Sequence, residues 1–237
     1  MNKLTIAAAI CAALCVSPAQ ARKKPEPTPA KPAPYASTYQ AIASAPVLIQ
    51  NATVLTGTGE RLDNADVLMQ DGKIQAVGKA LSPPGNAKII NGAGKWVTPG
   101  IIDVHSHLGV YANPGIQATS DGNEATNAVT ANVWAEHSVW PQDAGFAKAL
   151  AGGVTSMQIL PGSANLVGGR SVILKNVAAT TFQAMKFPDA PYGIKMACGE
   201  NPKRYYGGMM RAPMTRMGNV AGYRQAFADA QEYQRGL

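Results

Sequence analysis

The fold is indicated most clearly by one stretch, Trp96-Val-Thr-Pro-Gly-Ile-Ile-Asp-Val-His-Ser-His-Leu-Gly109. Its Pro-Gly turn is followed by a short run rich in β-branched residues, which is typical of a buried strand. Side chains two residues apart in a strand point to the same face. The pattern therefore predicts that Asp103, His105 and His107 share one face of a strand.

Two imidazoles and a carboxylate on one strand face predict a metal site. Neutral imidazole is the commonest protein ligand for zinc-like ions, and a rigid strand fixes its direction. The chain has only 3 histidines in 237 residues, so finding two of them in register favours ligation. The alternative is a strand with two incidental histidines, because His-x-His alone is a short pattern.

Three stretches carry a resemblance to a known family. Thr98-Pro-Gly-Ile-Ile-Asp-Val-His-Ser-His107 resembles the first-strand signature of the amidohydrolase superfamily of metal-dependent hydrolases. Gly152–Gly162 and Gly193–Arg204 resemble further blocks of its imidazolonepropionase-like branch. The resemblance covers about Val47 to Arg235. It implies an α/β fold, in which a small β-sandwich segment precedes the N-terminal half of a TIM-type (β/α)8 barrel.

The resemblance also implies a ligand that bridges two metal ions. Lys195 lies in an apolar strand pattern, where a buried lysine is costly unless it is paired or neutralised. In the family a carboxylated lysine on the fourth strand bridges the metals, and Gly193-Ile-Lys-Met196 is similar to that position. Glu200 is the alternative, because some members use a glutamate. The sequence leaves the choice between Lys195 and Glu200 open.

Other residues are assigned roles around this site. Asp103 is expected to orient a histidine ligand, unless it is a buried strand carboxylate with a structural role. Arg170 is expected in a substrate-side loop, as a candidate contact for a substrate carboxylate. Asn201 belongs to a polar cluster after the fourth strand, with Lys203, Arg204 and Tyr205. This cluster is expected to line the site, with solvated Lys203 and Arg204 as the alternative. His137 matches no ligand position of the family and is expected to be a surface or packing histidine.

The implied activity is metal-assisted hydrolysis of C–N bonds in amides, cyclic amides or peptide-like substrates. It would use one or two divalent ions, with zinc expected. The family also supplies two histidines and a proton-accepting aspartate from later strands. No histidine follows His137 in this chain. The catalytic residue is therefore unknown and expected beyond Leu237, and the 237 residues alone are expected to be inactive.

The first 46 residues are predicted to be an export leader and a tether. Residues 1–21 combine a basic start, a short apolar core and an Ala19-Gln-Ala21 cleavage site, which is typical of a signal peptide. Residues 22–46 are basic and Pro-rich, which favours extended polyproline II. We expect an exported protein, periplasmic or secreted, with no transmembrane anchor after cleavage before Arg22. A buried N-terminal helix is the alternative for the leader.

Residues 47–96 are predicted to form a small β domain, half of a β-sandwich, with a hairpin at Asp71-Gly72. Over residues 97–237, strand-like runs alternate with Gly-rich loops and helical stretches, which indicates parallel βα units. A complete barrel takes about 250 residues, so this part is expected to be a truncated barrel of about four units. Later strands are expected at 154–160, 171–176 and 193–197, and helices at 143–150 and 220–234.

Charge and cysteine content limit the partners. The net charge is +7, but five Lys or Arg and one acidic residue precede Pro46. The excess therefore belongs mostly to the leader and tether rather than to a nucleic-acid surface. Only Cys198 remains after leader removal, so no disulfide is expected within the mature chain. We expect a small-molecule substrate and no nucleic-acid partner, and whether the chain forms a homo-oligomer is left open.

Two other functions fit parts of the sequence. A non-catalytic truncated barrel would act as a metal-binding or interaction module. An exported solute-binding protein would share the leader but would not need His105 and His107. In-frame codons for two histidines and a late aspartate after Leu237 would favour the enzyme, whereas a stop codon would favour the module.

Overall fold

The computed structural model describes residues 35–236. The predicted signal peptide (1–21) and residues 22–34 of the predicted tether lie outside the described residues. Residues 35–46 contain no helix or strand and are mostly exposed. Between residues 35 and 236, no helix is both long enough and apolar enough to span a bilayer.

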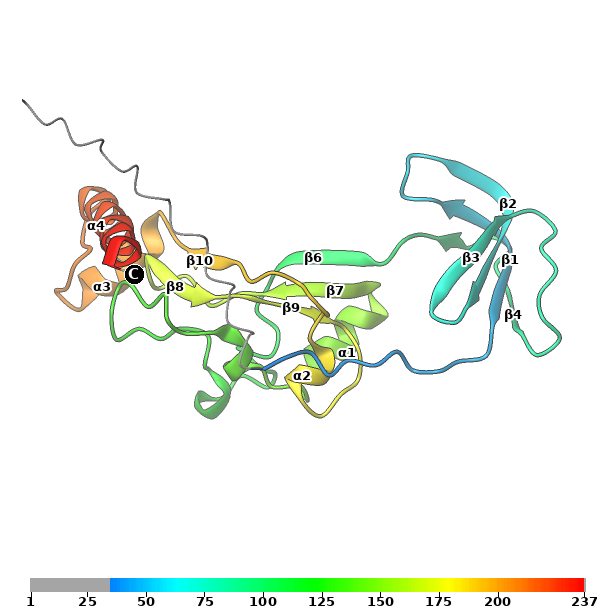
Figure 1. The fold of residues 1–237 in the computed structure, drawn as a ribbon, viewed down its shortest axis with the longest axis horizontal. Helices are drawn as coiled ribbons and strands as arrows, with labels where there is room; N and C mark the ends of the chain where they lie inside the picture. Colours follow the sequence, from blue (N-terminus) through cyan, green and yellow to red (C-terminus); the bar gives the residue numbers. More distant parts are fainter. Residues whose placement is uncertain (1–34, 237) are drawn as a thin grey trace, which may run out of the picture. The chain divides into compact units, whose positions relative to one another are not determined.

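Five strands form the first sheet (Figure 1). β1 lies between β2 and β4, while β3 pairs with β2 and β5 pairs with β1. The pairs β1–β2 and β2–β3 are antiparallel, whereas β4 and β5 run parallel to β1. The bounds are β1 (Val47–Leu55), β2 (Arg61–Gln70), β3 (Lys73–Gly78), β4 (Lys88–Asn91) and β5 (Trp96–Val97).

The predicted hairpin joins β2 to β3. Asp71 and Gly72 have φ values of 53° and 71°, and positive φ at both central residues is what a type I′ turn requires. One face of the sheet buries a small apolar cluster that includes Ala52, Val54 and Val67. The predicted half-sandwich and the domain limits at residues 46 and 96 stay predictions.

A second sheet consists of β6 (Ile101–Ser106), β7 (Val154–Ile159) and β9 (Val172–Lys175), in that order. β6 and β7 are parallel, and the chain between them contains a long loop and the helix α1 (Ala144–Ala151). Parallel strands need such a crossover. The predicted strand at 154–160 and helix at 143–150 are therefore confirmed, with Asp143 as the residue that caps α1.

The third predicted strand is present but runs in the opposite direction. β9 pairs antiparallel with β7, with Met157 opposite Leu174 and Ile159 opposite Val172. These four side chains are buried in one core. Within the described chain no helix separates β7 from β9, so there is no helical crossover to make the pair parallel. The expectation of parallel pairing is wrong for this strand.

The fourth predicted strand also pairs antiparallel. β10 (Ile194–Met196) runs beside β8 (Val167–Arg170) in a separate two-stranded sheet. Only Ser171 separates β8 from β9. These two adjacent strands nevertheless belong to different sheets, because β8 pairs with β10 and β9 pairs with β7. Gly169 has φ +110°, and a Cβ there would lie 2.6 Å from the carbonyl oxygen of Val133. The fold is thus mixed α/β, and a half barrel stays a proposal.

The helices α3 (Glu200–Gly208) and α4 (Arg216–Gly236) follow the last strand, β10 (Figure 1). The helix predicted at 220–234 is confirmed and is longer than expected. The 3₁₀-helix η2 precedes α1, and its residue Ala135 is part of the main core. The bounds are η1 (Gln117–Thr119), η2 (Ala135–Ser138), α2 (Phe182–Met185), α3 (Glu200–Gly208) and α4 (Arg216–Gly236).

The main core lies on one face of β7 and β9. Phe146 of α1 and Met185 of α2 pack there against the alternating buried residues of the two strands. β6 differs from the sequence-based expectation of a buried strand, because Ile102 and Val104 are each 68% exposed. Among the described residues only β7 pairs with β6, so an edge strand carries these apolar side chains.

A buried ion pair anchors the start of the described chain. Nζ of Lys186 lies 2.6 Å from Oε2 of Glu136, and the two side chains are 8% and 0% exposed. The same ammonium donates to the carbonyl oxygen of Tyr35 at 2.6 Å and to the hydroxyl of Tyr192. Ser37 donates to the carbonyl oxygen of Lys186. This end of the predicted tether therefore binds to the core instead of being fully solvated.

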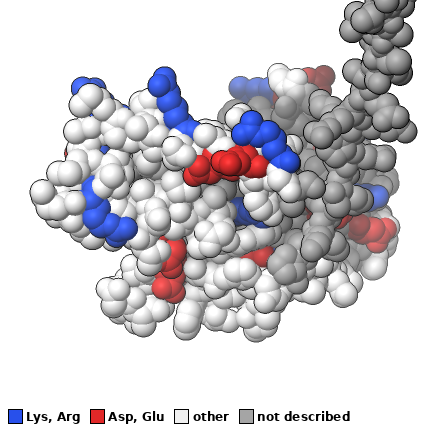
Figure 2. Space-filling model, turned by 60° about the vertical axis from the view of Figure 1, so that its left-hand side comes forward, with Lys and Arg blue, Asp and Glu red and all other residues white. Residues whose placement is uncertain are grey.

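Charged side chains are sparse on the face shown in Figure 2. Basic and acidic groups lie there in small separate clusters on a mostly uncharged surface. Among the described residues of this face, no continuous basic patch is seen.

Candidate metal centre and its pockets

The end of β6 brings two histidines together. His105 is exposed near the end of the strand, and His107 follows the last strand residue, Ser106. Their ring centroids are 5.2 Å apart with an interplanar angle of 82°. The predicted proximity of the pair is therefore present, although His107 lies just beyond the strand.

His107 is oriented by a backbone carbonyl. Its Nδ1 lies 2.9 Å from the carbonyl oxygen of Leu160, the residue after β7. A carbonyl oxygen only accepts, so Nδ1 carries the proton and Nε2 keeps its lone pair. Burial lowers the pKa of His107, which favours the neutral imidazole that a metal needs.

Asp103 contacts the backbone near the site. Its Oδ1 accepts from the backbone N–H of His105 at 3.0 Å. It therefore steadies the main chain of β6, and this hydrogen bond does not involve an imidazole. The orienting partner that the structure shows is the carbonyl of Leu160, which the sequence did not single out.

Lys195 joins the histidine pair from β10. Its side chain is buried, and Nζ lies 3.5 Å from Nε2 of His105 and 3.2 Å from the carbonyl oxygen of Pro161. Burial lowers the pKa of Lys195, because the charged form loses hydration. Three of the predicted ligands, from two distant parts of the chain, thus converge.

Glu200, the alternative bridging ligand, forms no hydrogen bond to either histidine within the described chain. It is the exposed first residue of α3. Between residues 35 and 236, no three His, Cys, Asp or Glu side chains lie close enough to hold a metal ion. The geometry therefore brings Lys195, and not Glu200, into contact with the pair, and the ligand role of each stays a prediction.

A cavity of about 510 Å³ opens beside His107. Asn201 lines it and donates to the Ser163 hydroxyl at 2.6 Å. Arg170 does not line it, since its guanidinium stacks on Trp134 at 4.4 Å. Of the two predicted substrate contacts, only Asn201 lies at this cavity.

Tyr111 and Asn123 also line this cavity, and neither was predicted from the sequence. The Asn123 amide donates to the Tyr111 hydroxyl, and the ring of Tyr111 lies 5.8 Å from that of His107. A Cβ at Gly122 or Gly162 would collide with Tyr111. Burial raises the pKa of Tyr111, which keeps its hydroxyl protonated. In the sequence, the Pro161-Gly162 turn after β7 was the available signal for this part of the cavity, because Gly162 lies against Tyr111 and Asn123.

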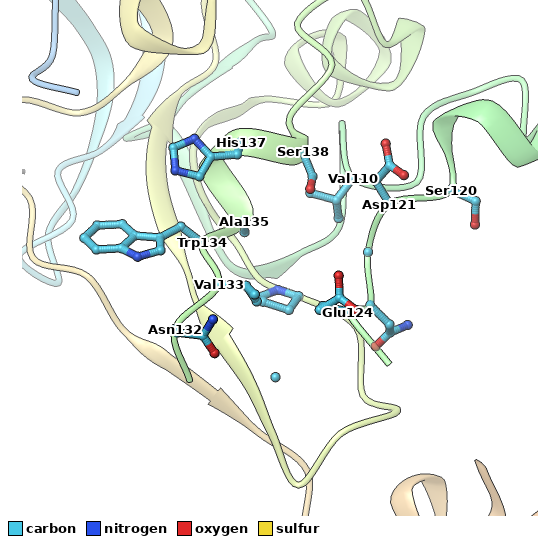
Figure 3. Close-up of a pocket in the computed structure, with 14 residues that line it drawn as sticks. Val110, Ser120, Asp121, Glu124, Asn132, Val133, Trp134, Ala135, His137 and Ser138 are labelled. Carbon is cyan, nitrogen blue, oxygen red and sulfur yellow. The ribbon is translucent and has the colours of Figure 1, made fainter. Parts of the chain in front are cut away.

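A second cavity of about 550 Å³ lies between the loop at 120–124 and the segment at 132–138 (Figure 3). Figure 3 shows Glu124, Trp134 and His137 arranged around it. His137 also makes an edge contact with Tyr35, with 5.2 Å between ring centroids. Asn123 lines both cavities.

No protein-family model matches the chain. The amidohydrolase tasK of Hapsidospora irregularis is 35% identical over 216 aligned residues, a match that covers 80% of this chain and 22% of that protein. A dihydroorotase of Trichlorobacter lovleyi is 27% identical over 144 residues, covering 60% of this chain and 28% of that protein.

A solved structure is also similar. An amidohydrolase from Thermotoga maritima is 42% identical with a TM-score of 0.73, and the match covers 80% of this chain and 49% of that one. The chain thus spans about half the length of the solved relative and less than a third of the two curated relatives. The imidazolonepropionase-like branch stays a prediction. The likeness in sequence and in fold nevertheless shows that the chain belongs to the amidohydrolase superfamily.

Proposed function

We propose that this chain contributes the metal-binding strands of an exported, metal-dependent hydrolase that cleaves C–N bonds in small amides or cyclic amides. The observation that carries the proposal is the convergence of His105, His107 and Lys195, of which His107 lines a cavity. Relatives named amidohydrolase and dihydroorotase support the reaction class.

The donor set fits a divalent ion of the zinc type. His105 and His107 provide two imidazoles, and the contact between His107 and Leu160 leaves Nε2 free to bind. A bound ion would lower the pKa of a water molecule and polarise the scissile carbonyl. Catalytic zinc sites use at least three protein ligands, so the pair needs at least one more.

Lys195 fits as that further ligand after carboxylation. Its pKa is lowered by burial, and the neutral amine is the form that attacks carbon dioxide. A bond forms between Nζ and the carbon of carbon dioxide while one C–O π bond opens, and the nitrogen releases one proton. The product is an anionic carbamate that supplies oxygen donors and removes the cost of a buried cation.

The chain's own residues also shape the space for a substrate. Tyr111, held by Asn123, presents a protonated hydroxyl at the cavity beside His107. Such a hydroxyl is a hydrogen-bond donor for a substrate oxygen. The cavity volume lies within the range of small-molecule sites.

We further propose that this chain forms the first part of a TIM-type barrel within a longer protein. The parallel pair β6–β7 with its helical crossover supports this, as does the match to half of the Thermotoga maritima chain. The remaining ligands and the proton acceptor would then come from other parts of the whole protein.

Zinc content tests the proposal. The purified chain is dialysed against zinc, and bound metal is measured for wild type, for the double variant His105→Ala with His107→Ala, and for His137→Ala. We expect the double variant to lose the bound zinc. The matched control His137→Ala removes the third histidine of the chain and should retain the metal.

Two outcomes count against the proposal. Equal zinc content in the wild type and the double variant would make the pair structural. Zinc binding without chelator-sensitive hydrolysis of any amide by the whole protein would instead favour the metal-binding module.

A further inference from the structure

The cavity beside His107 has an uneven charge distribution. It is lined by the segment after β6, the loop after β7 and the first turns of α3. Arg204 is its only formally charged residue when histidine is neutral, and no Asp or Glu lines it. The lining therefore favours an anion over a cation.

Arg204, which is exposed, forms no ion pair within the described chain. The two ion pairs seen among residues 35–236 involve other residues. Glu200 precedes Arg204 by one helical turn on α3, yet the two do not form an ion pair. A guanidinium offers five N–H donors in a planar fork that matches a carboxylate. Arg204 is thus free to bind an anion from the cavity.

Neighbouring polar groups add donors for such an anion. Tyr205 and Tyr111, which both carry a hydroxyl, line the same cavity. The amide of Asn201 is already engaged with Ser163, so it contributes less. α3 holds this arrangement in place, because the fully buried Tyr206 donates to the carbonyl oxygen of Asn127 at 2.6 Å.

The other cavity has the opposite character. Asp121 and Glu124 line it, and it contains no Lys or Arg. Since Asn123 borders both cavities, an anionic group entering this region is repelled on one side and attracted on the other. The contrast gives a molecule in the region a preferred orientation.

We propose that the cavity beside His107 binds a carboxylate of the substrate, with Arg204 as the residue that recognises it. The inference rests on the proposed hydrolase function and narrows its substrates to amides that carry an acidic group. The carboxylate lies toward Arg204 and the amide lies toward His107.

The test uses two matched probes on the metal-free chain, because a bound metal would itself attract carboxylates. N-acetylglycine carries a carboxylate, and N-acetylglycinamide is its uncharged counterpart. Binding is measured by NMR titration of protein stripped with a chelating resin. We expect wild type to prefer N-acetylglycine by at least about tenfold, the strength of one hydrogen-bonded charge pair.

Three variants test the assignment. Arg204→Gln should abolish the preference, and Arg204→Lys should retain part of it, because the charge remains but the fork is lost. The matched control is Lys203→Gln, which makes the same charge change one residue earlier on α3, outside the cavity lining. It should behave like wild type.

The outcomes separate this inference from the proposed function. Equal binding of both probes by wild type, or an equal loss in Lys203→Gln and Arg204→Gln, would overturn the carboxylate site. Either result would leave the zinc measurement untouched. A preserved preference in a chain that binds no zinc would support the anion site and refute only the hydrolase.

Discussion

Nζ of Lys195 lies 3.5 Å from Nε2 of His105, although 90 residues of chain separate them. If His105 binds a metal ion, as we propose, an ammonium at this distance would repel the ion, because both charges are positive. The proposed metal site therefore requires an uncharged or anionic form of Lys195. The contact fits a lysine that is neutral or carboxylated when the site holds a metal.

Replacement of Lys195 is the first prediction. Lys195→Ala should weaken zinc binding by more than about tenfold, because the histidine pair loses its further ligand. Equilibrium dialysis of the chain measures this change. In the whole protein, short carboxylic acids should partly restore activity to Lys195→Ala by replacing the carbamate oxygens.

Glu200→Ala is the matched variant for that experiment. The structure places Glu200 on the exposed start of α3, so its removal should leave zinc binding unchanged. If Glu200→Ala loses zinc and Lys195→Ala keeps it, the glutamate is the ligand.

The second prediction concerns Asp143, which binds the long loop that follows β6. Its buried carboxylate accepts from the backbone N–H groups of Gly109, Asn113 and Gly145. Asp143→Ala should lower the free energy of unfolding by about 2–4 kcal/mol, because a helix cap is lost and backbone donors are left unpaired. Urea denaturation followed by circular dichroism measures it.

The exposed carboxylate of Asp121 provides the control for Asp143. Asp121→Ala in the same loop should change the stability by less than about 0.5 kcal/mol. A comparable loss in both variants would show that the three hydrogen bonds of Asp143 add little.

The third prediction concerns the replacement of Gly162. A Cβ there would collide with the hydroxyl of Tyr111 and the side chain of Asn123. Gly162→Ala should therefore displace both groups from the cavity beside His107 and lower the stability by about 1–3 kcal/mol. Weaker N-acetylglycine binding would report the displacement. Gly115→Ala, where a Cβ meets no atom within 4 Å, should do neither.

The local elements were predictable because short-range physics determines them. The Asp71-Gly72 hairpin follows from the positive φ that its turn requires. The cap of α1 at Asp143 follows from the unpaired N–H groups of a helix start. The direction of β9 and β10 was missed, because the direction depends on which strand each one pairs with, and the sequence does not show the partner.

The site was predictable to a similar extent. The two-residue spacing of His105 and His107 placed them together. The roles of Leu160 and Tyr111 were missed, because a backbone carbonyl has no sequence signal and the contact of Tyr111 with His107 depends on close approach to Gly122 and Gly162. The docking of Tyr35 against Lys186 was missed because a Pro-rich composition predicts solvation.

Export is the fourth prediction. Protein isolated from the producing cells should begin at Arg22, because Ala19-Gln-Ala21 is a cleavage site of the kind that signal peptidase recognises. N-terminal sequencing of the secreted or periplasmic fraction checks this. Detection of Met1 in that fraction would remove the leader assignment.

The fifth prediction concerns the buried pair Lys186–Glu136. Lys186→Met leaves the fully buried Glu136 without its counter-ion and should lower the free energy of unfolding by about 3–5 kcal/mol. The double variant Lys186→Met with Glu136→Leu removes both charges and should be less destabilised than the single one. Urea denaturation of the three proteins compares them.

The same pair sets a dependence of stability on pH. Burial alone would lower the pKa of Lys186, but hydrogen bonds to Glu136 and Tyr192 outweigh it and raise the pKa. A raised lysine pKa means that the stabilisation is complete below the unfolded value of about 10.4 and is lost as pH rises through the folded value. Unfolding measured from pH 8 to pH 11 should therefore show an alkaline loss of stability in wild type. That loss should be smaller in Lys186→Met, and equal alkaline slopes in the two proteins would contradict the assignment.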